Sequence, residues 1–121
     1  MRRLWFKKEM KEQLLAGKKT STTRYKPLRV GETYLCVGGS RFKAQPFGYV
    51  TIKETIPTKW FRVFQLHYKE EGFETAGVML AFVNKEKFIR NTAEDEVFWS
   101  SFEFKPIEQK MMDENEGYVK I

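Results

Sequence analysis

The chain has 121 residues, of which 41% are hydrophobic and 16% aromatic, enough apolar material for one domain with a buried core. Its 22 Lys and Arg exceed its 16 Asp and Glu. The resulting charge of +6 favours an anionic partner, nucleic acid first, or serves only solubility. A single cysteine, Cys36, and a single histidine, His67, exclude an intrachain disulfide and a Cys/His zinc site.

The start of the chain lacks the apolar stretch and the cleavage site of a signal peptide. No run approaches the roughly 18 apolar residues of a membrane span. We therefore expect an intracellular, cytoplasmic protein that does not enter a membrane. In the absence of repeats and linkers, residues 1–121 are predicted to form a single domain, with its core at 5–107 and a C-terminal extension at 108–121.

Residues 5–15 have the pattern of an amphipathic helix. Phe6, Met10 and Leu14 recur every four residues, with charged side chains between them. Gly17 is expected to end the helix, because glycine tolerates the left-handed conformation common at helix C-termini.

Three segments rich in β-branched and aromatic residues, at 20–25, 34–37 and 49–56, predict strands. Turn signals such as Pro27 and Pro46 separate them. Short strands with tight connections favour an antiparallel sheet that curls into a barrel over a parallel sheet with crossovers.

The second half of the chain predicts two helices and a strand. Thr58, after Pro57, is expected to cap a helix that reaches about residue 71, with an extended segment from Trp60 as the alternative. In a helix at 74–88, the apolar residues Val78, Phe82 and Val83 are spaced to form one face. Residues 97–104 predict a buried closing strand that ends before Pro106. The acidic stretch beyond residue 107 is either a loose tail or a last strand pair.

The densest polar cluster, residues 17–24, crosses the first junction between a predicted helix and a predicted strand. By composition alone it is typical of a surface turn. Its order, Gly17-Lys18-Lys19-Thr20-Ser21-Thr22-Thr23-Arg24 followed by Val30-Gly31-Glu32, resembles the signature of ASCH domains, which are related to PUA domains. Residues 67–73 and a late strand with Phe102-Glu103-Phe104 follow in the family's order. The resemblance thus covers about residues 5–105.

This resemblance implies an α+β fold: a small, mostly antiparallel, PUA-like β-barrel with flanking helices and a cleft beside it. The fold is thought to bind RNA or a nucleoside. One bacterial subfamily of similar size is an amidohydrolase that removes the acetyl group from N4-acetylcytidine with a lysine, a threonine and a glutamate. These residues match Lys19, Thr22 and Glu71 of this chain. No ligand spacing supports a metal site, and we expect no cofactor.

The chemistry of these three residue types agrees with amide hydrolysis. Thr22 would be the nucleophile, Lys19 the base that takes its proton, and Glu71 the acid that protonates the leaving amine. To act as a base, Lys19 must have a pKa lowered by burial or by the neighbouring cations Lys18 and Arg24.

The spacing of Lys19 and Thr22 imposes a condition. Residues three apart point to opposite faces of a regular strand, so the two meet only if Lys19 lies in the turn before the strand. Thr20, Thr22 and Arg24 do share a strand face. Arg24 is a candidate ligand for a phosphate, a ribose or a pyrimidine carbonyl, or else pairs with Glu71.

Other polar residues are weaker candidates. His67 lies one helical turn before Glu71 and either faces it or simply packs. Arg41, Lys43 and Lys53 either line a basic groove or are ordinary solvated side chains. The predicted substrate-binding or RNA-binding residues are therefore Lys18, Thr20, Arg24, His67, Arg41 and Lys43.

The remaining residues with reactive or stacking side chains are expected in the core. Cys36 stands in an apolar strand and should be a buried hydrophobe rather than a nucleophile. The same holds for Trp5, Trp60 and Trp99, which are each surrounded by apolar residues.

Two classes of function thus stay open. The first is an amidohydrolase acting on a modified cytidine nucleoside, which requires Lys19 and Thr22 in an enclosed pocket with Glu71 at its rim. The second is a PUA-like RNA-binding module without chemistry, acting in translation or RNA processing, with an affinity that falls steeply with salt. Ribonuclease activity is a third and weaker option.

Overall fold

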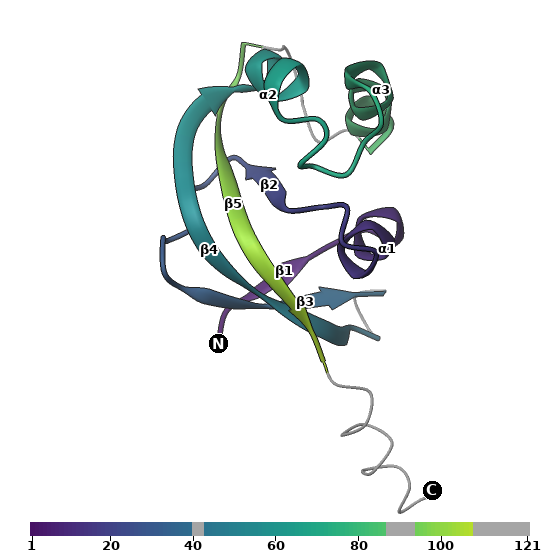
Figure 1. Ribbon diagram of the computed structural model, residues 1–121, viewed down its shortest axis with the longest axis vertical. Coiled ribbons are helices and arrows are strands. Elements are labelled where there is room, and N and C mark those ends of the chain that lie inside the picture. The colour runs from purple at the N-terminus through teal and green to yellow at the C-terminus, as the bar shows by residue number, and fades with distance from the viewer. Residues whose placement is uncertain (40–42, 87–93, 108–121) are drawn as a thin grey trace, which may run out of the picture.

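Five strands form one strongly curved sheet in the order β1-β3-β4-β5-β2 (Figure 1). The computed structural model describes residues 1–39, 43–86 and 94–107. Along the chain the elements are β1 (Arg3–Trp5), α1 (Lys8–Leu15), β2 (Ser21–Arg24), β3 (Thr33–Gly38), β4 (Gln45–Lys59), α2 (Trp60–Leu66), α3 (Ala76–Glu86) and β5 (Glu96–Pro106).

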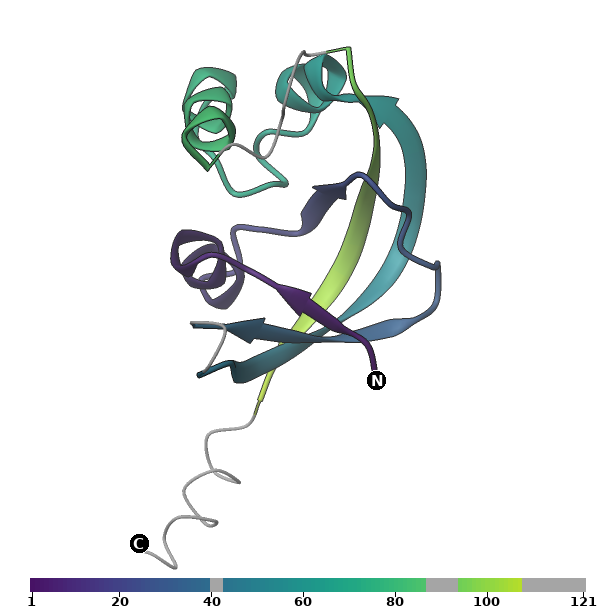
Figure 2. The ribbon, with the colours of Figure 1, turned by 180° about the vertical axis from the view of Figure 1, so that it is seen from behind.

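All strand pairs are antiparallel except β1 with β3, which run parallel. The long strands β4 and β5 bend around α1 and α3, which both lie on the concave side of the sheet (Figures 1 and 2). A break in register between Ile52 and Glu54 interrupts the pairing of β4 with β5 and adds to this bend. The expected α+β fold, a mostly antiparallel barrel-like sheet with flanking helices, is thereby confirmed as a half-barrel.

The first helix begins later than the sequence pattern predicts. Met10 and Leu14 are buried in α1 as expected, but α1 starts only at Lys8. Trp5 instead belongs to β1 and pairs with Val37 of β3. A strand of three residues is too short to show its own alternation of apolar and polar residues. The predicted helix therefore wrongly included Trp5.

The predicted helix cap at Thr58 is wrong, because β4 continues through Pro57 to Lys59. The partner β3 covers β4 only as far as Thr51, so the later part of β4 has one open edge. Proline is tolerated on an open edge because its missing N–H costs no ladder hydrogen bond there. The helix α2 therefore starts at Trp60, and the alternative of an extended segment from this residue is also wrong.

The third helix agrees with the prediction in its position. The closing strand lies where it was predicted but does not end before Pro106, because β5 includes this residue, which pairs with Gly48 of β4. Thr75 accepts a hydrogen bond on Oγ1 from the Val78 amide, 3.1 Å away, and thereby caps the start of α3. Val83 is buried together with Met79, whereas Val78, expected on the same face, is exposed. The predicted end of the helix at 87–88 and the predicted C-terminal extension at 108–121 lie outside the described residues.

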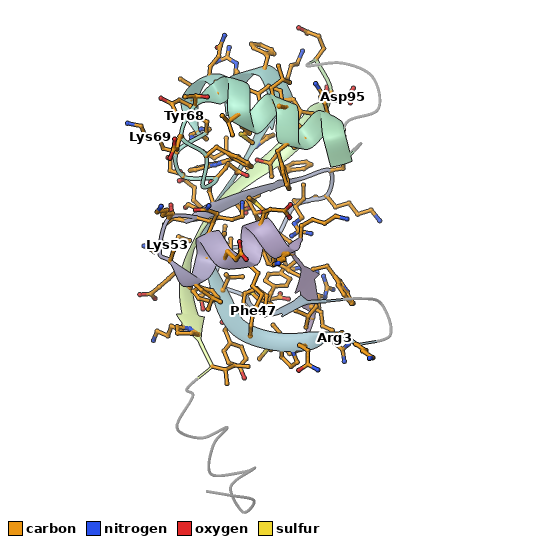
Figure 3. The ribbon with its side chains drawn as sticks, turned by 90° about the vertical axis from the view of Figure 1, so that its right-hand side faces the viewer. Arg3, Phe47, Lys53, Tyr68, Lys69 and Asp95 are labelled. Atoms are coloured by element: carbon orange, nitrogen blue, oxygen red, sulfur yellow. The ribbon has the colours of Figure 1, made fainter. Side chains whose placement is uncertain are left out.

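The core has two parts. One cluster packs the sheet against α1 and includes Leu14, Val50 and Phe102; the other packs α2 and α3 against β5. Phe73 and Phe82 contact both clusters. In the view of Figure 3, α3 lies above α1 on this side of the molecule, and the junction between the two clusters lies between these helices.

Cys36 is fully buried, and burial raises the pKa of its thiol to about 12, so it is a core residue as predicted. Trp60 and Trp99 are buried as well. The prediction fails for Trp5, which is 42% exposed. Within the described part of the chain, no helix has the length and apolar character needed to cross a membrane.

Candidate functional site

The end of α1 places Lys19 by a hydrogen-bonded glycine turn. Gly17 has a φ of +78°, and the Lys18 amide donates back to the Gln13 carbonyl at 2.9 Å, the pattern of a Schellman motif. The Lys19 amide donates to the same carbonyl at 3.2 Å. Lys19 therefore stands in the turn before β2, outside the strand alternation, and its side chain is only 3% exposed.

Glu71 lies on the opposite wall, in the turn that follows α2. Its amide donates to the His67 carbonyl at 3.0 Å. The next residue, Gly72, has a φ of +101°, and a Cβ there would come within 3.1 Å of Gln13 and 3.3 Å of Lys19. Glycine thus satisfies both the backbone conformation and the close approach that brings Glu71 to Lys19.

Lys19 and Glu71 form a buried ion pair. The lysine Nζ donates to Glu71 Oε1 at 3.3 Å and to the Glu71 carbonyl at 3.2 Å, and the glutamate is 4% exposed. Burial lowers the pKa of Lys19, although the charge and the hydrogen bond of Glu71 oppose the shift. Lys19 therefore loses its proton more readily than an exposed lysine would.

The other carboxylate oxygen of Glu71 is held by two hydroxyls of β2. Ser21 Oγ and Thr23 Oγ1 both donate to Oε2 at 3.0 Å. Sequence reasoning missed both residues, although their i, i+2 spacing puts them on one face of the strand. With Lys19 on Oε1 and the hydroxyls on Oε2, the carboxylate has a fixed orientation.

Thr22 lines the same cavity as Lys19 and Glu71 and is 5% exposed. It pairs with Ser100 across the β2–β5 ladder. Thr20 shares neither feature. It is exposed, it does not line the cavity, and its contacts with the rest of the fold are backbone hydrogen bonds to Glu70 and Phe102.

The cavity has a volume of about 710 Å³ and lies between the two core clusters. Its walls are mostly apolar and aromatic, and its charged and polar groups lie on β2, at the start of α1, and at Lys19 and Glu71. The lining residues are Trp5, Phe6, Lys7, Lys8, Met10, Lys19, Thr22, Thr23, Arg24, Tyr25, Gly39, Trp60, Glu71, Phe73, Met79, Phe82 and Val83.

Arg24 lies at the seam between the two edge strands of the sheet. Its Nη2 donates to the Trp5 carbonyl at 3.2 Å, and its guanidinium lies 5.2 Å from the centre of the Phe6 ring. No carboxylate of the described residues pairs with it, so the alternative of an Arg24–Glu71 ion pair is not realised. One side of this cation is fixed to β1, and the side chain also lines the cavity.

His67 lies elsewhere. Its ring stacks on Trp99 at 3.9 Å between centroids, and Nδ1 lies 3.4 Å from Glu70 rather than facing Glu71. It lines a second cavity of about 600 Å³ beside α2.

Three further basic residues are not brought to the site. Lys18, Lys43 and Lys53 are exposed and line neither cavity, and Arg41 lies outside the described residues. Among the described residues, no group of three His, Cys, Asp or Glu side chains could hold a metal ion.

The arrangement can hold and move a proton. It combines a buried amine and a carboxylate in contact, a buried hydroxyl in the same cavity, and walls with several aromatic side chains. An amine, a carboxylate and a hydroxyl are the side-chain groups that acid–base and nucleophilic catalysis use.

Solved structures share this fold at low sequence identity. A protein of Enterococcus faecalis from the family DUF984 superposes with a TM-score of 0.65 at 14% identity, covering 89% of this chain and 82% of that one. The ASCH protein of Zymomonas mobilis superposes with a TM-score of 0.61 at 14% identity, covering 93% and 76%. A single-residue variant of the Zymomonas protein gives 0.60 at 13%.

No family model matches the sequence, and no curated protein does. The structural matches show that the chain has an ASCH-like, PUA-related fold, as its resemblance to ASCH domains implies.

Proposed function

We propose that the protein is an amidohydrolase that removes the acyl group from N4-acetylcytidine or a related modified cytidine nucleoside. The observation that carries this proposal is the contact between Lys19 and Glu71, 3.3 Å apart and buried in a cavity that Thr22 also lines. A lysine whose pKa is lowered by burial is a suitable base for a threonine hydroxyl, which is a weak nucleophile on its own.

In the proposed reaction, the Lys19–Glu71 pair carries one shared proton. With that proton on Glu71, neutral Lys19 takes the proton of Thr22 as its Oγ1 attacks the acyl carbon, and Glu71 protonates the N4 nitrogen as the C–N bond breaks. Cytidine leaves and the acyl group stays on Thr22 as an ester. The proton then moves from Lys19 back to Glu71.

Water completes the cycle through the same pair. Lys19 takes a proton from water as the water oxygen attacks the ester, and Glu71 returns a proton to the Thr22 oxygen. The products are a carboxylic acid and the free threonine. The hydrogen bond between Lys19 and Glu71 supports this exchange, because each half-reaction needs the proton to cross between them.

The cavity suits a single nucleoside. Its volume of about 710 Å³ lies within the range of small-molecule sites, roughly 300 to 1,000 Å³. Trp5, Tyr25 and Phe73 supply aromatic faces on which a pyrimidine can stack. The ASCH-like fold and the resemblance of residues 17–24 to ASCH amidohydrolases support the same assignment.

RNA binding without chemistry is the second candidate. The observation that favours it is the presence of Lys7 and Lys8, two exposed residues, at the same cavity. It predicts an affinity for single-stranded RNA that falls steeply with salt, together with no turnover of any acylated nucleoside.

The test is a chromatographic assay of purified protein with N4-acetylcytidine. We expect release of cytidine and acetate, and a loss of about 100-fold or more in Lys19→Met, Thr22→Val and Glu71→Gln. Thr22→Ser, which keeps a hydroxyl, should retain activity, and Thr20→Val is the matched control because Thr20 is exposed and does not line the cavity.

Absence of turnover in the parent protein would overturn the proposal, as would full activity in folded Thr22→Val. Circular dichroism of each variant separates a loss of chemistry from a loss of fold. Thr22→Val removes no charge from the buried pair and should leave the fold intact. Its activity is therefore the decisive test of the proposal.

A further inference from the structure

We propose that Ser21 and Thr23 are positioning residues for the acid of the site. By holding Oε2 of Glu71, their hydroxyls keep the proton that this carboxyl exchanges on the other oxygen, Oε1, which Lys19 contacts. This role rests on the proposed function for the reaction itself. It goes beyond the proposed function in adding two hydroxyls to the lysine, threonine and glutamate of the mechanism, and in naming the oxygen that carries the proton.

The acceptor positions of the Glu71 carboxylate are nearly all occupied. A carboxylate has about four lone pairs, two on each oxygen. Ser21 Oγ and Thr23 Oγ1 each donate to Oε2 at 3.0 Å and thereby use both of its lone pairs. Lys19 Nζ donates to Oε1 at 3.3 Å. No other side chain in the described part of the protein donates a hydrogen bond to this carboxylate, so the open acceptor position is on Oε1.

This occupancy decides which oxygen carries the proton. When Glu71 is protonated on Oε1, Oε2 is the carbonyl oxygen of the acid and still accepts both hydroxyl hydrogen bonds. A proton on Oε2 would require one of the hydroxyls to give up its hydrogen bond, and a buried hydroxyl without a partner costs free energy. The proton therefore stays on Oε1, the oxygen from which Lys19 takes it and to which Lys19 returns it.

The covalent geometry of Glu71 does not orient its carboxylate. The terminal torsion of a glutamate side chain has a broad energy profile, so hydrogen bonds must select the orientation. The main chain of Glu71 is held separately, because its amide donates to the His67 carbonyl at 3.0 Å and its carbonyl accepts from Lys19 Nζ at 3.2 Å. Loss of a hydroxyl therefore frees the rotation of the carboxylate and leaves the backbone of this turn in place.

The two hydroxyls differ in their access to a substrate. Ser21 is fully buried and does not line the cavity, whereas Thr23 is half-buried and does. Ser21 therefore acts on the reaction only through Glu71. Because Ser21→Ala removes no charge from the buried ion pair, this variant tests the orientation of the carboxylate alone.

The experiment compares the steady-state kinetics of the parent protein with those of Ser21→Ala, Thr23→Val and the double variant, with N4-acetylcytidine as the substrate. We expect kcat to fall about tenfold in each single variant and about 100-fold in the double variant, the order of effect of losing hydrogen bonds to a charged group. In Ser21→Ala, KM should stay within about twofold of the parent value, because this residue does not line the cavity.

Three controls separate positioning from packing. Thr23→Ser keeps the hydroxyl and should keep the kcat of the parent protein. Thr33→Val is the matched change elsewhere and should leave kcat unchanged. Thr33 is also a half-buried strand threonine, its hydroxyl lies 2.9 Å from that of Thr51, and it lines neither cavity. In Glu71→Gln, adding Ser21→Ala should lower the residual rate no further, because the hydroxyl acts through the carboxylate.

Unchanged kcat in the folded double variant would overturn the inference and leave the proposed function standing. A rise in KM alone, a Thr23→Ser variant as slow as Thr23→Val, or a further loss of rate on adding Ser21→Ala to Glu71→Gln would also overturn it. Circular dichroism shows whether each variant is folded, and if the double variant is not, the single variants decide. Absence of turnover in the parent protein would overturn the proposed function, and the positioning role with it.

Discussion

The buried pair of Lys19 and Glu71 makes a quantitative prediction about stability. Lys19→Met keeps the length of the side chain but removes its charge, so that Glu71, 4% exposed, stays buried without its ion-pair partner. Removing one partner of a buried ion pair costs about 3 to 5 kcal/mol. Because Ser21 and Thr23 still donate to Oε2, we expect the lower end, about 3 kcal/mol.

The assay is urea unfolding followed by the fluorescence of the buried residues Trp60 and Trp99. With a slope of about 1.5 kcal/mol per molar urea, a loss of about 3 kcal/mol moves the midpoint down by about 2 M. The matched control is Lys18→Met, since Lys18 is the exposed neighbour and a surface change of this kind stays within about 0.5 kcal/mol.

A double variant isolates the interaction between the two charges. Glu71→Met should also cost about 3 kcal/mol, because it leaves the buried Lys19 without its counter-charge. In Lys19→Met combined with Glu71→Met neither charge remains, so the total loss should be smaller than the sum of the single losses by about 3 kcal/mol. Strict additivity, or a Lys19→Met midpoint equal to that of Lys18→Met, would refute the buried ion pair.

Burial lowers the pKa of Lys19 below its reference value of 10.5, so between the lowered value and 10.5 the unfolded chain binds more protons and the free energy of unfolding rises with pH. Urea titrations at about pH 8 and about pH 10 should show that the free energy of unfolding rises less in Lys19→Met than in the parent protein. The thiol of Cys36, with its pKa raised to about 12, should react with a thiol reagent only as fast as the protein unfolds, and rapid labelling of the native protein would contradict its burial. Gly48→Ala puts a Cβ 2.5 Å from the Phe104 ring and should cost about 1 to 3 kcal/mol in thermal unfolding. Gly77→Ala in α3, where a new Cβ would lie 3.8 Å from Thr75 Oγ1, is its control and should not destabilise the protein.

Local sequence patterns predicted those parts of the fold whose signals are local. Met10 and Leu14 mark the buried face of α1, and Gly17 marks its end by a backbone conformation that glycine adopts readily. The extent of β4 was not predictable in this way. By itself, Pro57 is a turn signal. It is acceptable within β4 because β3 ends earlier, so that this part of β4 pairs with β5 only.

The candidate site shows the same division. The resemblance of residues 17–24 to ASCH domains pointed to Lys19 and Thr22, and the structure puts both at one cavity because Lys19 precedes the strand. The role of Ser21 and Thr23 depends on where Glu71 lies, about fifty residues further along the chain. His67 was expected near Glu71 from helical spacing, but α2 ends at Leu66 and the ring turns to Trp99.

The two walls of the site are joined by the backbone as well as by side chains. The amides of Thr20 and Ser21 both donate to the Glu70 carbonyl, at 2.6 and 3.0 Å. Neither hydrogen bond can survive if the turn after α2 moves away from the start of β2. The hydrogen–deuterium exchange rates of these two amides therefore measure how often the site opens, independently of any substrate.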